Sequence, residues 1–154
     1  GRPVTEIQMA DLLREVRRRF DFCLLDAPAG LGRGFQLATC AADRCVVVTT
    51  ADASSLRDAQ HTVMELDRFP SGALHLVVNR VRKKLLRQLH ATIDDAIDKA
   101  GLPLLGVVPE DDALPLCMNR GVPILLADGQ SAATAYRNIA KRLQGERVPL
   151  LRIR

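Results

Sequence analysis

The sequence has few aromatic residues and no tryptophan, which argues against nucleic-acid binding by base stacking. Aromatic side chains make up 3% of its 154 residues, so flat surfaces on which bases could stack are scarce. The formal net charge, from 22 basic and 18 acidic residues, is only +4. A basic run at residues 80–87 is typical of a solvated surface, and nucleic-acid binding through it is the weakest alternative. We therefore expect no nucleic-acid partner.

Long apolar runs and paired cysteines are also missing. No run approaches the roughly 20 apolar residues that span a bilayer, and the first residues do not form a signal peptide. No Cys-x-x-Cys pair occurs, and three of the four cysteines lie in apolar stretches. We therefore expect reduced, buried thiols in a cytoplasmic protein. The isolated histidines show no spacing of metal ligands. The cysteines are Cys23, Cys40, Cys45 and Cys117.

The composition fits one globular domain over residues 1–154, with 47% hydrophobic and 26% charged residues and no linker or repeat. Continuous apolar runs predict parallel strands that are covered on both faces. Helical periodicity fills the gaps between them, and short connections join the elements. The predicted fold is an α/β sandwich of three layers with a mainly parallel sheet and right-handed crossovers. The predicted strands are residues 22–25, 45–48, 74–78 and 104–108.

Four amphipathic helices are predicted. The first follows a capping box at residues 5–8, with Met9, Leu12, Leu13, Val16 and Phe20 facing inward. The second, after Ser54 and Ser55, buries Leu56, Ala59, Val63 and Leu66. The third covers residues 86–100 and stops at Gly101, and the fourth begins at Ser131 and ends at Gly145.

Polar residues follow each predicted strand, at the edge where open parallel sheets bind ligands. Asp26 follows the first run directly, as in a Walker B motif, whose carboxylate orients Mg²⁺ or its water. An aspartate in this place is also a common cap. Asn79 and Arg80 follow the third run and are equally typical of a simple turn. The glycines at 30, 32 and 34 match neither G-x-x-x-x-G-K-[ST] nor G-x-G-x-x-G.

A series of motifs in order along the chain resembles MinD, a family of septum-positioning ATPases of the deviant-Walker (ParA/MinD) P-loop class. Asp-Ala-Pro-Ala-Gly at 26–30 is similar to the switch II region of that family. The resemblance implies a Rossmann-like P-loop NTPase sandwich that binds ATP and Mg²⁺. The further motifs are Val-Val-Thr-Thr at 47–50, Val-Asn-Arg-Val-Arg at 78–82, Gly-Val-Val-Pro-Glu-Asp at 106–111 and Asn-Arg-Gly-Val-Pro at 119–123.

The resemblance assigns the nucleotide's phosphates to the first of these motifs. Asp26 would be the catalytic carboxylate, near the attacking water and, through water, the metal. Gly30 would sense the γ-phosphate with its backbone N–H, and Pro28 would stiffen the loop.

The base is assigned to the later motifs. Asn79 would hydrogen-bond the adenine edge, with Arg80 stacking or packing beside it. The loop of Pro109, Glu110 and Asp111 would form a wall of the base site.

Arg57 and Asp58 match the surface where the family receives MinC-like and MinE-like proteins. Periodicity alone makes both residues part of a solvated helix face. The resemblance further implies a homodimer and a cytoplasmic protein with peripheral inner-membrane association in the full-length form. The membrane contact would use a tail that the short stub at residues 148–154 does not supply.

Two departures from the family pattern stand out. The family's G-K-G-G-V-G-K-T-T loop is absent, and no Gly-Lys-Ser or Gly-Lys-Thr occurs in the 154 residues; Gly32 stands where the family has Glu. We therefore expect the C-terminal portion of such a domain, truncated at the N-terminus and inactive by itself. The alternatives are a ParA-type or flagellum-placement relative, and a non-catalytic partner-binding module centred on Arg57, Asp58 and Glu65.

Overall fold

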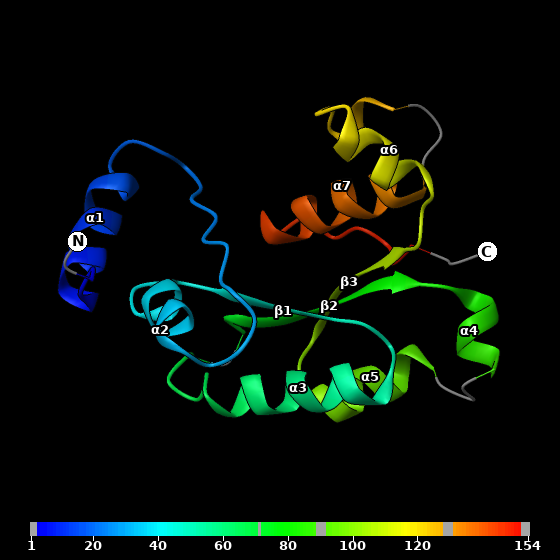
Figure 1. Cartoon of the computed structure of the whole chain (residues 1–154), viewed down its shortest axis with the longest axis horizontal. Coiled ribbons are helices and arrows are strands. Elements are labelled where there is room, and N and C mark those ends of the chain that lie inside the picture. The colour runs from blue at the N-terminus through cyan, green and yellow to red at the C-terminus, as the bar shows by residue number, and fades with distance from the viewer. Residues whose placement is uncertain (1–2, 71, 89–91, 128–130, 152–154) are drawn as a thin grey trace.

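The computed structural model describes residues 3–70, 72–88, 92–127 and 131–151 and has three layers (Figure 1). A parallel sheet in the order β1-β2-β3 forms the middle layer. Helices α3 and α5 cover one face, and α6 and α7 lie over the other. The predicted α/β class is confirmed. The strands are β1 (Cys45–Thr49), β2 (Leu74–Val81) and β3 (Leu104–Pro109); the four helices are α3 (Ala53–Met64), α5 (Ile93–Ala100), α6 (Ala113–Asn119) and α7 (Ser131–Leu143).

Three of the four predicted strands are confirmed. Strand β1 pairs with β2 in an unbroken register from Cys45 opposite Leu74 to Thr49 opposite Val78. Strands β2 and β3 each continue past their predicted ends, to Val81 and Pro109. Within the described ranges, no helix has both the length and the apolar character that crossing a membrane requires.

The core has two parts, one on each face of the sheet. Leu76 and Val78 of β2 face α3 and α5, and both are fully buried. Val77, between them, faces the opposite way and packs with the α7 layer. Gly106 of β3 lies so close to α7 that a Cβ there would overlap Ile139. The inward faces predicted for residues 56–66 and 135–143 are confirmed, because these side chains belong to the two clusters.

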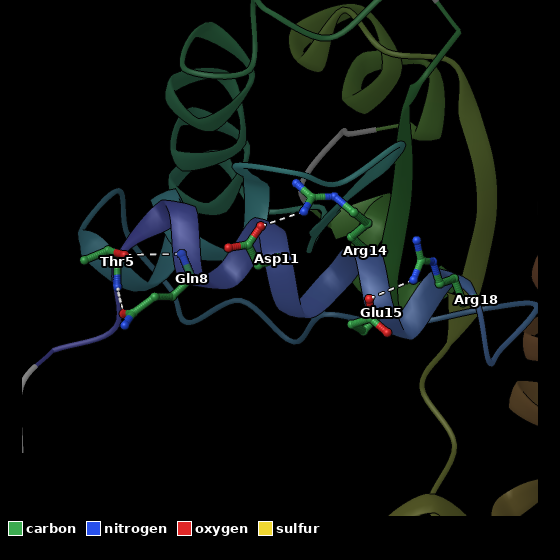
Figure 2. Close-up of polar contacts among 6 residues, drawn as sticks. All are labelled: Thr5, Gln8, Asp11, Arg14, Glu15 and Arg18. Carbon is green, nitrogen blue, oxygen red and sulfur yellow. Dashed lines mark hydrogen bonds and ion pairs between the residues drawn. The ribbon is translucent and has the colours of Figure 1, made fainter.

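Helix α1 (Glu6–Arg17) begins with the predicted capping box (Figure 2). The Gln8 N–H donates to Thr5 Oγ1 at 3.2 Å, and the Thr5 N–H donates to Gln8 Oε1 at 3.0 Å. Surface ion pairs follow along the helix: Arg14 to Asp11 at 2.8 Å and Arg18 to Glu15 at 3.2 Å. The two reciprocal hydrogen bonds of the capping box satisfy backbone N–H donors, which every helix N-terminus leaves free.

The inward face predicted for α1 is only partly right. Leu13 is buried, but Leu12 is 57% exposed and Phe20 64% exposed. The reason is position: α1 lies beside α2 (Arg33–Thr39), away from the sheet (Figure 1). Polar bonds tie it there, with Arg17 Nη2 donating to Ala41 O at 2.6 Å and Arg33 Nη2 to Val4 O at 2.5 Å.

The strand predicted at residues 22–25 is wrong. This segment has no regular secondary structure, and its side chains Phe22 and Leu24 are 66% and 89% exposed. A strand needs a neighbour to accept and donate its backbone hydrogen bonds, and this segment has no such neighbour among the described residues. The prediction that both faces of β1 are covered is also wrong, because Val46 and Val48 are 38% and 60% exposed.

The single helix predicted over residues 86–100 is also wrong. The structure has α4 (Lys83–Gln88) and, separately, α5. Thr92 is extended at φ −121° and begins α5 with a second capping box, in which its hydroxyl accepts from Asp95 N at 3.1 Å. Residues 89–91, between the two helices, lie outside the described ranges. The predicted stop at Gly101 is confirmed by its left-handed φ of +67°.

All four cysteines are free, as expected for reduced thiols. Their predicted burial is wrong: Cys23 is exposed and the other three are half-buried. Cys23 lies in the segment that does not form a strand, so the sheet does not enclose it.

Candidate functional site

Polar side chains gather at the carboxyl ends of β2 and β3, which point to the same side of the molecule (Figure 1). Between the pairs Val78–Val107 and Val81–Pro109, β2 advances by one residue more than β3. The extra residue makes a β-bulge at Asn79–Arg80. Bulges re-aim side chains and are frequent beside binding sites.

The bulge has an unusual backbone at Arg80. Its φ of +53° is the only positive value of a non-glycine residue in the described part of the chain. A non-glycine residue in this region costs about 1–2 kcal/mol. The Arg80 N–H donates to Asn79 Oδ1 at 2.9 Å, which partly offsets that cost. Asn79 is half-buried, while Arg80 is exposed.

Glu110 connects the bulge to the end of β3. Its Oε1 accepts from Arg80 Nη2 and from Arg82 Nη2, both at 3.1 Å. Its backbone N–H also donates to Val81 O at 3.1 Å. The Glu110 side chain is only 21% exposed, whereas the arginine side chains are 67% and 59% exposed. The hydrogen bond from Arg80, with a further contribution from Arg82, lowers the pKa of Glu110 although partial burial opposes this. We call Asn79, Arg80, Arg82 and Glu110 the carboxyl-end corner.

Arg82 was not predicted as a site residue. The signal that could have found it is the spacing of two arginines, at 80 and 82, beside an acid that ends the next strand. In the structure, the chain bulged at Asn79–Arg80 brings both guanidinium groups to the Glu110 carboxylate.

The Asp111 side chain makes its hydrogen bonds within the protein. Its Oδ1 accepts from Ala113 N at 3.1 Å, and its Oδ2 accepts from Ala132 N at 3.1 Å and from Ser131 Oγ at 3.4 Å. It therefore joins the first turns of α6 and α7 behind the β3 exit. Pro109, the last residue of β3, is half-buried beside it.

Asp26, Pro28 and Gly30 lie on the exposed segment between α1 and α2. Gly30 has φ +88°, which only glycine adopts readily, and the Pro28 ring packs where a Cβ at Gly34 would be. In Figure 1 this segment lies at the left, while β2 and β3 end at the right. Within the described ranges, no hydrogen bond or ion pair links Asp26 to the carboxyl-end corner.

Helix α3 presents Arg57 and Asp58 to solvent, as its periodicity predicts. Leu56 and Ala59, next to them in sequence, are buried against the sheet. Among the residues that the structure describes, Arg57 makes one side-chain hydrogen bond, from Nε to Ala53 O of its own helix at 3.3 Å. The guanidinium and carboxylate are therefore available to a partner.

The start of α3 holds a second polar cluster at a strand end. Asp52 accepts from Ser55 N at 3.0 Å and from Thr50 Oγ1 at 2.5 Å. The Ser55 backbone bond, with the Thr50 hydroxyl, lowers the Asp52 pKa to about 2. One carboxylate oxygen thus caps α3, and the other accepts from the Thr50 hydroxyl.

No preformed metal site exists among the described residues, because nowhere do three His, Cys, Asp or Glu side chains come together. Mg²⁺ commonly binds through one or two carboxylates together with a nucleotide's phosphates. Asp26 is an exposed carboxylate, so an ion that keeps its water shell can reach it.

Comparison with known proteins agrees with this fold. The family model described as "Cellulose biosynthesis protein BcsQ" matches residues 4–143. The septum site-determining protein MinD of Bacillus subtilis is 37% identical over 145 residues, which is 93% of this chain and 54% of that protein. The chain spans about half the length of the curated relatives it matches.

Solved structures also show similarity to MinD proteins. In the MinC:MinD cell division protein complex of Aquifex aeolicus, one chain superposes with a TM-score of 0.89 at 30% identity, over 97% of this chain and 63% of that one. The cell division ATPase MinD of Pyrococcus furiosus gives a TM-score of 0.77 at 25% identity, over 92% of this chain and 59% of that one. The chain therefore belongs to the family that the BcsQ model describes, and its sequence and fold are similar to those of MinD proteins.

Proposed function

We propose that this chain is the base-binding and partner-binding part of a MinD-type ATPase that acts in positioning the division septum. The carboxyl-end corner supports the proposal most: a polar, bulged edge lies where open parallel sheets bind ligands. Asn79 would bind the adenine edge, with Arg80 beside the ring. Pro109 and Glu110 would form a wall of the base site, with Asp111 supporting the loop.

The phosphates of ATP would meet the segment between α1 and α2. Asp26 would hold Mg²⁺ through water and orient the attacking water, Gly30 would donate its N–H to the γ-phosphate, and Pro28 would stiffen the loop. This requires the segment to approach the carboxyl ends of the strands. Phosphoryl transfer depends on positioning and on charge stabilisation of the phosphates. Because these 154 residues contain no Gly-Lys-Ser or Gly-Lys-Thr, we expect the isolated chain not to hydrolyse ATP.

The proposal extends to partners and location. Arg57 and Asp58 on α3 would receive MinC-like and MinE-like proteins; the solved MinC:MinD complex of Aquifex aeolicus supports the first of these. In its full-length form the protein would dimerise with ATP bound and associate reversibly with the inner membrane from the cytoplasm.

A chimera tests the proposal. This chain would replace the matched segment of Bacillus subtilis MinD, which supplies the rest of the domain. We expect ATP turnover by the chimera, loss of it with Asp26→Ala, and weaker ATP binding with Asn79→Ala. An exposed acid elsewhere on the chain, changed by Glu146→Ala, is the matched control and should change neither.

Two results would contradict the proposal. One is a folded chimera, shown by circular dichroism, that neither binds nor hydrolyses ATP. The other is turnover by residues 1–154 alone that Asp26→Ala abolishes, because the isolated chain would then be a complete enzyme.

The matching family model favours a second candidate, in which the same ATPase serves cellulose biosynthesis. Deleting the gene in its source organism separates the two roles. Misplaced septa with normal cellulose support the first candidate, and lost cellulose with normal septa supports the second.

A further inference from the structure

Glu110 makes its contacts inside the protein, although the proposed function would place it in the wall of the base site. One carboxylate oxygen accepts from two arginines, and the backbone N–H of Glu110 binds the carbonyl of the residue between them. Three bonds thus run from the end of β3 to residues 80–82. The partly buried acid is the only partner that the described residues provide for either guanidinium.

Arg80, which pairs with Glu110, is also the residue with the strained backbone. Arg80 has the positive φ, and its N–H donates to Asn79 Oδ1. With the peptide unit before Arg80 held in place, an ordinary negative φ would swing the Arg80 side chain away from Glu110. With the side chain held in place, the same change would turn that peptide unit, and its N–H, away from Asn79 Oδ1. The ion pairs therefore oppose the relaxation.

The same bond fixes the orientation of the Asn79 amide. A backbone N–H can donate only to the oxygen of a side-chain amide, so the amide nitrogen must point the other way. No acceptor for its two N–H groups occurs in the described ranges, so they are donors for a ligand.

We propose that Glu110 is a positioning residue: shared between Arg80 and Arg82, its carboxylate holds the bulge in its left-handed form and thereby presents the Asn79 amide N–H groups to the nucleotide base. The proposal rests on the proposed function for the identity of the ligand. The contacts by which Glu110 holds the bulge, which we call the brace, are a property of the unliganded chain. The positioning role and the proposed function can therefore fail separately.

NMR of the ¹⁵N-labelled chain tests the brace. Its readouts are hydrogen exchange and the HN–Hα coupling of Arg80, and the side-chain amide peaks of Asn79. We expect Glu110→Ala to speed exchange at Arg80 by about tenfold or more, the size expected from losing hydrogen bonds to a charged group. Glu110→Gln keeps the shape and one acceptor and should restore part of the protection. Glu15→Ala, which removes the comparable ion pair to Arg18 on α1, is the matched control (Figure 2).

The pattern of change separates positioning from general loosening. Amides of Val78 and Val107, which are paired just before the bulge, should keep their exchange rates in every variant. Unchanged Arg80 and Asn79 signals in Glu110→Ala would overturn the proposal. So would equal loosening at Val78 and Val107, or failure of Glu110→Gln to restore any protection. If Glu110→Ala does not fold, Glu110→Gln decides, with an intermediate loss at Arg80 expected and no loss contradicting the brace.

Titration of the Bacillus subtilis chimera with Mg-ATP then separates the two proposals. We expect the Asn79 amide peaks to shift in the wild-type chimera, and about tenfold more ATP to be needed in the chimera that carries Glu110→Ala. An equal response of the two chimeras would overturn the positioning role. If the wild-type chimera does not respond to ATP, the proposed function is removed, while the contacts of Glu110 stand.

Discussion

The region before β1 (residues 3–44) and the region from β1 onward, which we call the packed region, differ in how far they bury apolar side chains. In the first, seven large apolar side chains are exposed, among them Ile7 at 75% and Leu24 at 89%. In the packed region, β2 and β3 are covered on both faces, and Leu76 and Val78 are fully buried. The seven are Val4, Ile7, Leu12, Phe20, Phe22, Leu24 and Leu31.

The difference shows that an apolar run becomes a strand only beside another strand. Residues 22–25 are as continuously apolar as 45–48, yet only the second run pairs, because β2 lies next to it. Among the described residues, β1 likewise has a neighbouring strand on one side only, and its Val46 and Val48 are uncovered. The polar edge of the proposed base site is built in the packed region, and the proposed phosphate residues lie in the other.

The largest predicted effect is the difference in stability loss between two leucine-to-alanine variants, one from each region. Leu76→Ala should lower the free energy of unfolding by about 2–5 kcal/mol, because a fully buried side chain leaves a cavity. Leu24→Ala should change it by less than about 0.5 kcal/mol, since that side chain is already in water. Urea unfolding of both variants measures this. Similar losses would mean that residues 22–25 are packed after all.

Two glycines give the next contrast. Gly106→Ala should cost about 1–3 kcal/mol, because the new methyl group meets Ile139 and must push α7 away from β3. Gly32→Ala meets nothing and should cost less, about 0.5 kcal/mol, which reflects only that alanine is a poorer N-cap of α2 than glycine. Thermal unfolding compares them. A Gly106→Ala protein as stable as wild type would show that α7 does not pack tightly on the sheet.

The two capping boxes sharpen the comparison further. Thr92→Ala should lower global stability by about 1 kcal/mol, since α5 is part of the core. Thr5→Ala removes the same motif from α1, where it should fray that helix locally with little effect on global unfolding. Hydrogen exchange resolves the two effects. Equal global losses would place α1 in the same cooperative unit as α5.

The smallest predicted effect is the pH dependence from Asp52. Its folded pKa of about 2 lies below the unfolded value, so its ionised form stabilises the fold above pH of about 4. That contribution is lost as pH falls from about 4 to about 2, and solvent screening keeps it to at most about 1 kcal/mol. Asp52→Asn, which still caps α3, should show a shallower acid loss in urea unfolding at each pH. Identical slopes would contradict the assigned pKa.

Much of the fold could be predicted from the sequence. The strands of the sheet and the inward faces of α3 and α7 follow from local periodicity, and the capping box of α1 from a four-residue motif. The fate of residues 22–25 could not be predicted, because pairing depends on a neighbour that no local pattern specifies. The break between α4 and α5 was missed because one apolar stripe runs through both helices, although Thr92 carries a capping signal.

Of the candidate site, the placement of Asn79, Arg80 and Glu110 at one edge follows from parallel strands ending together. The bulge, the left-handed Arg80 and the participation of Arg82 depend on the register between β2 and β3. Sequence patterns do not determine that register to one residue. Asp111 could equally have faced a ligand, and its bonds to α6 and α7 depend on where those helices begin.

Photoaffinity labelling of the Bacillus subtilis chimera with 8-azido-ATP tests most directly whether the carboxyl-end corner binds the base of ATP. The reactive group sits on the adenine ring, so the labelled peptide reports which residues surround it. We predict label within residues 79–82 or 109–111, competed away by ATP and lost in Asn79→Ala. Competable label confined to other segments, with both of these peptides unmodified, would contradict the account.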